Sequence, residues 1–552
     1  MNTLALHARR ALIAIVSLTV FASALAGAHA EPESPTAIVI GTGAPASCTE
    51  VALFNALQLG GSITFNCGAA PHTLIVSALK QISVDASLDG GGTITLSGGG
   101  LAPLFQVFSG RAFTLTNITL ANARGTGGIT AIQNFGRLNI RNARFENNDA
   151  GANDGAAINN YGDVSIQDSV FFNNRSGANK RGGAIYIAAG SAAIARTQIV
   201  SNSGYFGGGL AVDNGDVKIS ETAFRQNAGF DGGGLYVASN VTPTIVASEF
   251  TSNTAFYGAG LEVVGAVMMT NTTVASNTAQ NDGGGIWFLN TSGVSQLNSL
   301  TFANNQATNG SALNFNGGDA QIKNSVISGV PSSASSNCIG AALDTTNIST
   351  DASCGTALVI ADVKLGPLTS GKYTRYHVPL SGSLLIDRLS TCPATDQRGV
   401  SRPFGALCDV GSIEVTPPDK VYVPIVAKPN VFQGTVEAEP NNLRTQANGP
   451  LQSGVNYFGN PNDANDYFSF VVPKAGAVDV TLSGHSGAAV NGLQLQLRDV
   501  NDQQVAFVFA DPFVINAPNL APGVYYVRIF YAPPGPYNSN TQYTLRVTYP
   551  AP

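Results

Sequence analysis

Charged residues are scarce in this 552-residue chain and make up 11% of it. The net formal charge of −6 argues against the basic surface that binds nucleic acid. Histidine occurs five times, twice within the first thirty residues, and no CxxC motif is present. These shortages argue against a zinc site. Apolar runs long enough to span a bilayer are missing after residue 30, so we expect no transmembrane segment in the mature chain.

The first thirty residues have the pattern of a secretory signal peptide. Arg9 and Arg10 precede an apolar stretch over residues 11–26, and Ala28-His29-Ala30 fits the small-x-small cleavage site. An uncleaved membrane anchor is the alternative, which the shortness of the stretch disfavours. We therefore expect a mature protein that begins near Glu31 and is secreted or displayed at the cell surface.

The six cysteines form three close pairs in the sequence, namely Cys48/Cys67, Cys338/Cys354 and Cys392/Cys408. An even number of cysteines in an exported chain indicates disulfides. Six cysteines allow 15 pairings, so pairing of neighbours is an expectation from proximity alone.

The chain is rich in glycine and contains a repeated sequence pattern. A bulky apolar residue, two variable residues and Asn recur seven times, with successive asparagines 24–28 residues apart. Runs such as Gly207-Gly208-Gly209-Leu210 alternate with them. Two markers with one period indicate a structural unit stacked on itself. The seven asparagines are Asn148, Asn174, Asn202, Asn227, Asn253, Asn277 and Asn305.

Three short strands fit into each repeat, and no helical stretch lies between them. Segments such as Gly215-Asp216-Val217-Lys218-Ile219 alternate polar and apolar residues, as half-buried strands do. Three strands per repeat predict one rung of a parallel β-helix. The apolar markers should then form an internal column, and the asparagines an amide ladder with a structural role. A helix over residues 48–57 is expected to cap the N-terminal end, and the β-helix should span residues 31–415.

The character of the chain changes after residue 415. A proline-containing linker is expected over residues 416–436. Residues 437–552 lack the period and contain alternating stretches such as Tyr467-Phe468-Ser469-Phe470-Val471-Val472. They predict a β-sandwich. The fold class is therefore all-β, a parallel β-helix followed by a small β-sandwich.

The paired Gly-Gly-Ala-Ile and Phe-x-x-Asn markers resemble the repeats of chlamydial polymorphic outer-membrane proteins, which implies a right-handed β-helix. The segment from Asp396-Gln397-Arg398-Gly399 to Glu414 resembles the ending of bacterial choice-of-anchor β-helix proteins. Those are exported surface proteins, usually with no assigned activity. No β-barrel segment follows the repeats, so self-translocation is not implied.

The C-terminal region resembles the bacterial pre-peptidase C-terminal domain. The resemblance rests on Glu437-Ala438-Glu439-Pro440-Asn441-Asn442, Asn465-Asp466-Tyr467-Phe468 and Leu520-Ala521-Pro522-Gly523. Related collagenase modules bind calcium, which implies Glu437, Glu439, Asn441 and Asp466 as candidate ligands, because a hard cation takes oxygen ligands. Ala464 replaces a second acid found in many relatives, and solvated acids beside a turn are the alternative.

Catalytic residues are hard to find in the repeats. A lyase needs an acidic cluster with a base, and an inverting glycosidase needs two carboxylates roughly 6.5–9.5 Å apart. Asp154, Asp231 and Asp282 each precede a Gly run, and turn formation is the favoured interpretation. No catalytic residue is therefore assigned.

Aromatic residues near the same turns are the better candidates for function. They could stack on sugars or contact a partner, or they could simply cover the turns. They are Tyr205, Phe206, Phe230, Phe256, Tyr257 and Trp287.

The sequence thus favours an exported, non-catalytic β-helix scaffold that binds a polysaccharide, or a cell-surface or matrix partner. The alternative is a polysaccharide lyase or glycoside hydrolase of the pectin-lyase-like type, which rests on fold analogy.

Overall fold

The computed structural model describes most of the chain. The predicted signal peptide and nearly all of the predicted linker lie outside the described part. The described residues are 37–289, 293–329, 335–416, 447–459, 465–483, 493–500, 503–509, 512–531 and 543–550.

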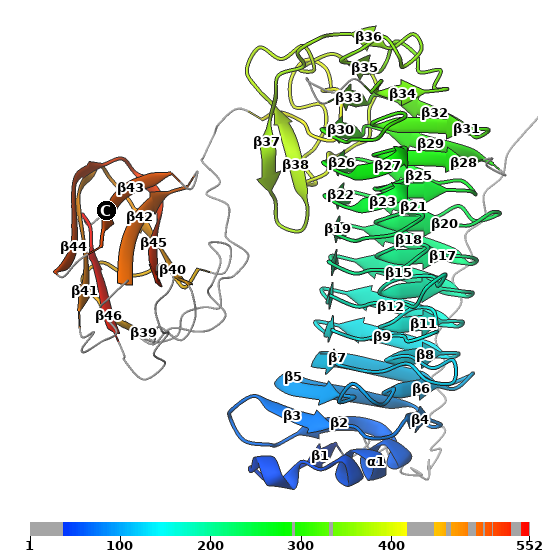
Figure 1. The fold of residues 1–552 in the computed structure, drawn as a ribbon, viewed down its shortest axis with the longest axis vertical. Coiled ribbons are helices and arrows are strands. Elements are labelled where there is room, and N and C mark those ends of the chain that lie inside the picture. The colour runs from blue at the N-terminus through cyan, green and yellow to red at the C-terminus, as the bar shows by residue number, and fades with distance from the viewer. Residues whose placement is uncertain are drawn as a thin grey trace, which may run out of the picture.

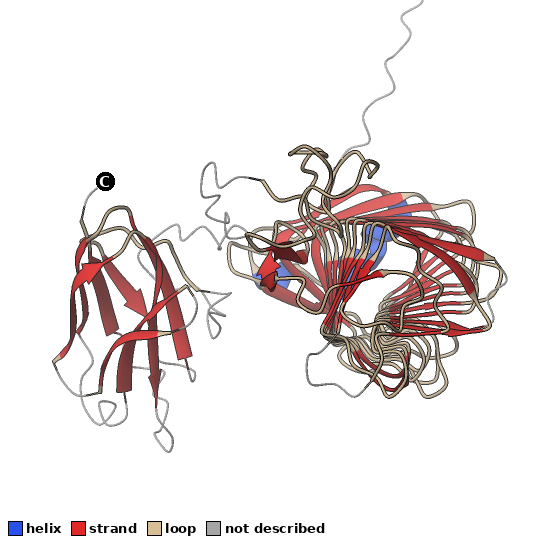
Figure 2. Ribbon diagram, turned by 90° about the horizontal axis from the view of Figure 1, so that it is seen from above, coloured by secondary structure: helices blue, strands red, loops and turns tan. Residues whose placement is uncertain are grey.

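The first of two structural units is a parallel β-solenoid, as predicted (Figure 1). Its rungs form three faces around a core of Phe, Leu, Ile and Val side chains, and the view along the axis shows the stacked strands (Figure 2). The first face contains β1 (Ile38–Ile40), β2 (Gly61–Phe65), β5 (Ala86–Ser97), β7 (Ala112–Ala121), β9 (Arg137–Arg141), β12 (Asp163–Gln167), β15 (Ser191–Ala195), β18 (Asp216–Ser220), β21 (Thr244–Val246), β25 (Met268–Thr270), β29 (Val294–Asn298) and β32 (Asp319–Lys323).

The second and third faces use shorter strands. The second contains β3 (His72–Ile75), the ends of β5 and β7, β10 (Arg144–Glu146), β13 (Val170–Phe172), β16 (Gln198–Val200), β19 (Ala223–Arg225), β22 (Glu249–Thr251), β26 (Thr273–Ala275), β30 (Thr301–Ala303), β33 (Val326–Ser328), β35 (Ile348–Ser349) and β36 (Leu358–Val359). The third contains β4 (Lys80–Ile82), β6 (Phe105–Val107), β8 (Ile132–Asn134), β11 (Ile158–Asn160), β14 (Ile185–Ile187), β17 (Leu210–Val212), β20 (Leu235–Val237), β24 (Leu261–Val263), β28 (Ile286–Leu289), β31 (Leu313–Asn316) and β34 (Cys338–Ile339).

The register between rungs places each apolar marker on its own copy. Phe145 pairs with Phe171 and Phe224 pairs with Phe250 in the parallel ladders. Their rings stack with centroids 4.7 and 4.5 Å apart, and all four side chains are fully buried. This spacing matches the separation of hydrogen-bonded strands, so the stack follows directly from the rung repeat.

The asparagine markers form the predicted amide ladder at the end of the second face. The Nδ2 of Asn227 donates to the Oδ1 of Asn253 at 3.0 Å and to the carbonyl of Ile199 at 2.8 Å. Its Oδ1 accepts from the backbone N–H and the side chain of Asn202, both at 3.0 Å. The same pattern runs from Asn148 to Asn305, and all seven side chains are buried. The ladder therefore satisfies itself and leaves no bonding capacity for a ligand.

The N-terminal end is covered by helix α1 (Glu50–Leu59), close to the predicted cap. The side chain of Thr49 accepts the backbone N–H of Ala52 at 3.2 Å, which satisfies one free amide of the first turn. Glu50 accepts from the backbone N–H of Ser77 at 2.8 Å and pairs with the buried Lys80 at 2.5 Å. These bonds attach the cap to the first rungs.

The C-terminal end folds back along the second face, which the sequence pattern did not predict. Strands β37 (Leu365–Ser370) and β38 (Arg375–Pro379) form a hairpin beside the rungs (Figure 1). Arg375 and Arg225 both contact the carboxylate of Glu249, whose side chain is fully buried. This shared ion pair attaches the hairpin to strand β22.

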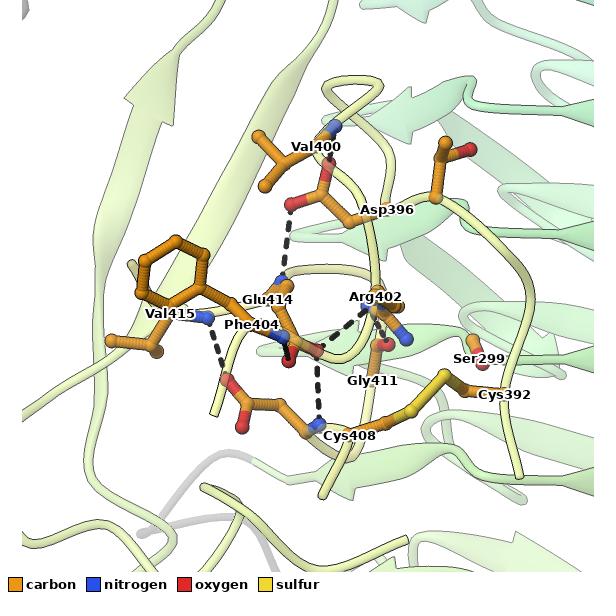
Figure 3. Close-up of polar contacts among 12 residues, drawn as sticks. Ser299, Cys392, Asp396, Val400, Arg402, Phe404, Cys408, Gly411, Glu414 and Val415 are labelled. Atoms are coloured by element: carbon orange, nitrogen blue, oxygen red, sulfur yellow. Dashed lines mark hydrogen bonds and ion pairs between the residues drawn. A yellow bond between two sulfur atoms is a disulfide. The ribbon is translucent and has the colours of Figure 1, made fainter. Parts of the chain in front are cut away.

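The segment that resembles choice-of-anchor proteins forms a buried polar network (Figure 3). Asp396 accepts from the backbone N–H groups of Val400 and Glu414 at 3.0 and 3.1 Å. Glu414 accepts from the N–H of Phe404 at 2.8 Å and lies 3.5 Å from the guanidinium of Arg402. Because these charged groups bond to the backbone and to one another, they hold the closing loops together.

Three disulfides join neighbours in the sequence: Cys48–Cys67, Cys338–Cys354 and Cys392–Cys408. The expected pairing is confirmed. Within the described residues, no helix is long and apolar enough to cross a membrane.

The second unit consists of two antiparallel sheets of four strands each, with a core of aliphatic and aromatic side chains. One sheet contains β39 (Asn456–Gly459), β46 (Tyr543–Thr548), β41 (Gly476–Ser483) and β44 (Phe513–Leu520). The other contains β40 (Asn465–Val472), β45 (Gly523–Tyr531), β42 (Leu493–Asp499) and β43 (Gln504–Val508).

The amide ladder yields a prediction about stability. Asn227→Ala leaves the buried carbonyl of Ile199 and the buried N–H of Asn202 without their partners. We expect a loss of about 3 kcal/mol, because each unsatisfied buried group costs roughly 1–3 kcal/mol. Urea unfolding followed by circular dichroism measures it. Asn139→Ala, at a partly exposed position of β9, is the control and should cost under about 0.5 kcal/mol; equal losses in both variants would contradict the ladder's role.

Candidate functional site

Two parallel columns of side chains run along the third face of the solenoid. The strand column contains the central residues of successive strands, and the turn column contains the residue before each turn glycine. Ladder and bridge pairing align both columns from rung to rung. The strand column is Tyr186, Ala211, Tyr236, Glu262, Trp287 and Asn314. The turn column is Arg181, Phe206, Asp231, Tyr257, Asp282 and Asn309.

Turn glycines allow the two columns to lie close together. Gly258 has φ +56°, and a Cβ there would lie 2.9 Å from the Cβ of Glu262. Gly283 has φ +63°, and a Cβ there would lie 2.7 Å from the Cβ of Trp287. Glycine alone tolerates both the conformation and the approach. The close turn explains why Glu262 and Trp287, at outward positions of their strands, are 2% and 7% exposed.

The columns meet diagonally, so that a turn residue contacts the strand residue of the next rung. Phe206 packs on Tyr236 with ring centroids 5.2 Å apart. Asp231 shares a hydrogen bond with Glu262. One rung further, Tyr257 stacks on Trp287 at 4.5 Å. A carboxyl pair therefore lies between two aromatic pairs, and we call these six residues the acid–aromatic cluster.

Burial changes the acidity of the carboxyl pair. Removal from water, together with the charge and hydrogen bond of Asp231, raises the pKa of Glu262 to about 9. Burial also raises the pKa of Asp231 to about 6. The pair therefore holds one shared proton near neutral pH and carries about one negative charge. Burial and the nearby Glu262 raise the pKa of Tyr236 to about 12, so its hydroxyl stays protonated.

Two polar atoms of the cluster lack ordinary partners. The buried Oε2 of Glu262 has no hydrogen-bond partner among the described residues. The buried Nε1 of Trp287 has no acceptor within the part of the chain that the structure describes. These two residues are neighbours in the strand ladder. A buried group without a partner costs about 1–3 kcal/mol, so a free donor next to a free acceptor suggests a ligand.

The ends of the columns are satisfied internally. Arg181 pairs with Asp213 at 2.8 Å, and the hydroxyl of Tyr186 donates to the same carboxylate at 2.7 Å. At the other end, Asp282 accepts from the amides of Asn309 and Asn314 at 2.9 and 3.0 Å. Among the residues of the two columns, the buried atoms without a partner are the Oε2 of Glu262 and the Nε1 of Trp287.

The structure brings all six predicted aromatic residues into one chain of ring contacts. Phe206, Tyr257 and Trp287 belong to the acid–aromatic cluster itself. Tyr205, Phe230 and Phe256 form an outer row on the turns, stacked at 4.7 and 5.0 Å with interplanar angles of 14° and 1°. The outer row touches the cluster edge-on, through Tyr205 against Phe206 and Phe256 against Tyr257.

The outer row differs from the stacking stripe that the sequence suggested. Its ring faces lie against one another along the axis, so edges rather than faces meet solvent. Trp287 is likewise covered by Tyr257 and does not form an exposed platform. A sugar would therefore meet ring edges and the polar atoms between them.

The acids flanking the glycine turns play different roles. Asp154 accepts the backbone N–H of Arg181 in the neighbouring rung at 2.6 Å, so its carboxylate has a structural partner. Asp231 differs, because its carboxyl group contacts Glu262. Glu262 and Tyr236 were not among the candidate residues predicted from the sequence. A lone acid between two buried aliphatics, in Leu261-Glu262-Val263, was the available signal.

The candidate calcium ligands mostly lie outside the described residues, namely Glu437, Glu439 and Asn441. Asp466 is described, is 2% exposed, and accepts a hydrogen bond from the hydroxyl of Tyr543 at 2.7 Å. Calcium in this unit stays a prediction. Within the described residues, no three His, Cys, Asp or Glu side chains are grouped to hold a metal.

A hollow of about 360 Å³ on the first face is a weaker candidate. Its charged groups already have partners, since Asp163 accepts from Ser191 at 2.6 Å and Lys218 pairs with Asp216 at 2.7 Å. Small residues, Ala192 and Ala193, create the space.

Comparison with known proteins agrees with this architecture. The family model described as a right handed beta helix region matches residues 105–279. The chain contains a right-handed β-helix. The match includes the turns and strands that carry Arg181 through Glu262. No curated protein sequence matches the chain.

Two solved structures show further likeness. The pre-peptidase C-terminal domain of a Bacillus anthracis collagenase is 24% identical over 17% of this chain and 90% of that chain, with a TM-score of 0.15. The enzymatically active domain of tailspike protein 4 from bacteriophage CBA120 is 9% identical over 90% of this chain and 66% of that chain, with a TM-score of 0.17.

The carboxyl pair predicts a pH-dependent stability. Because both pKa values are raised in the folded state, that state holds protons more tightly than the unfolded chain, and stability falls as pH rises through about 6 and about 9. Glu262→Gln removes one titrating group and should lose less stability. We expect its melting temperature, relative to wild type, to rise by about 3–5 °C between pH 5 and pH 9.

Differential scanning calorimetry of the full chain at pH 5, 7 and 9 measures this difference. Asp216→Asn, an exposed acid on β18, is the matched control and should follow the wild type. Parallel curves for Glu262→Gln and wild type would refute the assignment of raised pKa values.

Proposed function

We propose that this protein is a carbohydrate-binding β-helix of the cell surface or extracellular space, and that the acid–aromatic cluster is its binding site. The observation that carries the proposal is the free Trp287 Nε1 donor beside the free Glu262 Oε2 acceptor. A sugar hydroxyl both accepts and donates a hydrogen bond, so one sugar can satisfy both atoms when the ring of Tyr257 is displaced from Trp287.

Two sets of buried polar groups in the solenoid, the amide ladder and the carboxylates of the closing loops, support this choice by contrast. The amide ladder is satisfied along its whole length. The carboxylates of Asp396 and Glu414 each accept backbone N–H groups in the closing loops. Polar groups buried for structural reasons are paired in this way. The acid–aromatic cluster departs from that pattern on a face lined with partly exposed rings.

Three disulfides support the extracellular location, because disulfides form and persist in oxidising compartments. The signal-peptide pattern at Arg9, Arg10 and Ala28-His29-Ala30 supports it independently.

The proposal predicts a loss of glycan affinity when the free donor is removed. Trp287→Phe keeps an aromatic ring against Tyr257 but deletes the N–H group. We expect affinity to fall about 3–10-fold, the value of one hydrogen bond. A panel of plant, fungal and bacterial polysaccharides, followed by isothermal titration with the best ligand, measures it.

Phe172→Leu serves as the control, because it removes an exposed ring from the second face and should leave affinity unchanged. A full chain that binds none of the panel, or a Trp287→Phe variant that binds like wild type, would contradict the proposal.

Glycoside hydrolysis is a second candidate, favoured by the separation of the two pKa values. One carboxyl group that stays protonated beside one that ionises is how an acid and a base are assigned in such enzymes. However, hydrogen-bonded carboxyl groups lie closer than the roughly 5–5.5 Å or 6.5–9.5 Å used by glycosidases. The geometry therefore favours binding. Release of reducing ends from the panel, abolished by both Asp231→Asn and Glu262→Gln, would establish hydrolysis instead.

A further inference from the structure

The carboxyl pair is enclosed by aromatic residues in both directions along the solenoid. In the strand column, Glu262 lies between Tyr236 and Trp287 in register. In the turn column, Asp231 lies between Phe206 and Tyr257. The two acids lie in neighbouring rungs, and the four rings enclose them. Such a site attracts a cation, since a positive charge neutralises the carboxylates.

The charges around the carboxyl pair also favour a cationic ligand. Arg181 is the single basic residue of the two columns, and its charge is neutralised by Asp213. Among the described residues, no basic side chain forms an ion pair with Asp231, Glu262 or Asp282. The centre of the face therefore carries uncompensated acidity, which a carboxylated sugar would increase and a cationic sugar would relieve.

We propose that the acid–aromatic cluster binds an amino sugar through its free ammonium group. The inference rests on the proposed glycan-binding function and names its ligand class. The ammonium group donates to the carboxyl oxygens of Asp231 and Glu262. A ring hydroxyl of the same sugar accepts from the Nε1 of Trp287, which gives this buried donor its partner. An N-acetylated sugar lacks the charge, and a uronic acid has the opposite charge.

Binding of the ammonium group should depend on pH. Below pH about 6 both carboxyl groups are protonated and neutral, so the attraction is weak; ionisation of Asp231 strengthens it. Tyr236 also faces the pair and stays neutral. Beyond Phe206 lies Arg181, whose positive charge is neutralised by Asp213. Asp154 and Tyr186 lie near this ion pair. Asp282, beyond Tyr257, adds negative charge at the opposite end. We expect affinity to be greatest where Asp231 is ionised and the amine of the sugar is still protonated.

The test compares two oligosaccharides of equal length on the full chain. The probes are a fully deacetylated glucosamine oligomer and its fully N-acetylated form, measured by isothermal titration at pH 5 and 7. We expect the deacetylated oligomer to bind at least tenfold more tightly at pH 7. Asp231→Asn and Glu262→Gln should remove this preference by at least tenfold. Asp216→Asn, with the same change in net charge on the first face, should keep it.

The outcomes separate this inference from the proposed function. Equal binding of the two oligomers, or binding of uronic-acid or neutral polymers alone, overturns the amino-sugar inference and leaves glycan binding in place. Absence of binding to every polysaccharide overturns both. A preference that persists in Asp231→Asn and Glu262→Gln, or that is lost equally in Asp216→Asn, shows attraction by net charge and also overturns the inference. Circular dichroism verifies that each variant is folded.

Discussion

In-register pairing of successive rungs is the constraint on which the rest of the structure depends. Backbone N–H groups of the strands bond to the rung beside them, so a strand residue is placed about 4.8 Å from the residue one repeat away. Identical residues then form columns, and the identical side chains of adjacent rungs must interact favourably. Phenylalanine stacks on phenylalanine, and the amide of Asn227 donates to Asn253 while it accepts from Asn202. Charge cannot be repeated in this way without repulsion, which accounts for the scarcity of charged residues in the chain.

The same constraint explains why the candidate site is recognisable. On the third face the columns change identity from rung to rung, and two acids occur in adjacent rungs between aromatic residues. The turn glycines hold these side chains out of water, which raises the pKa of Asp231 and Glu262. The two buried carboxyl groups meet on a face where Ala211, Tyr186 and Asn314 occupy equivalent positions in other rungs. A position where the residue type changes from rung to rung is therefore a better guide to a candidate site than a position where one type repeats.

The repeat made the solenoid predictable, because spacing along the chain reflects the rung directly. The N-terminal helix was predicted from its residue pattern, and the disulfides from the proximity of the cysteines. Contacts between distant segments were not predictable in this way. The hairpin of β37 and β38 reaches Glu249 through Arg375, 126 residues away in sequence. The motif from Asp396 to Glu414 resembles a known ending, but its role in bonding the closing loops follows only from its tertiary contacts. Tyr205, Phe206, Phe230, Phe256, Tyr257 and Trp287 were selected from the sequence, and their ring contacts confirm only that they lie together.

By itself the sequence determined the all-β class, the period and the buried columns, since these follow from short-range pattern. Tertiary structure alone decided which acids meet. Asp231 and Glu262 are 31 residues apart and contact each other because a turn in one rung leans diagonally onto the strand of the next. It also decided that the outer rings turn their faces toward one another. The burial and direction of a side chain are set by its neighbours in other rungs. The period of the sequence therefore does not predict them.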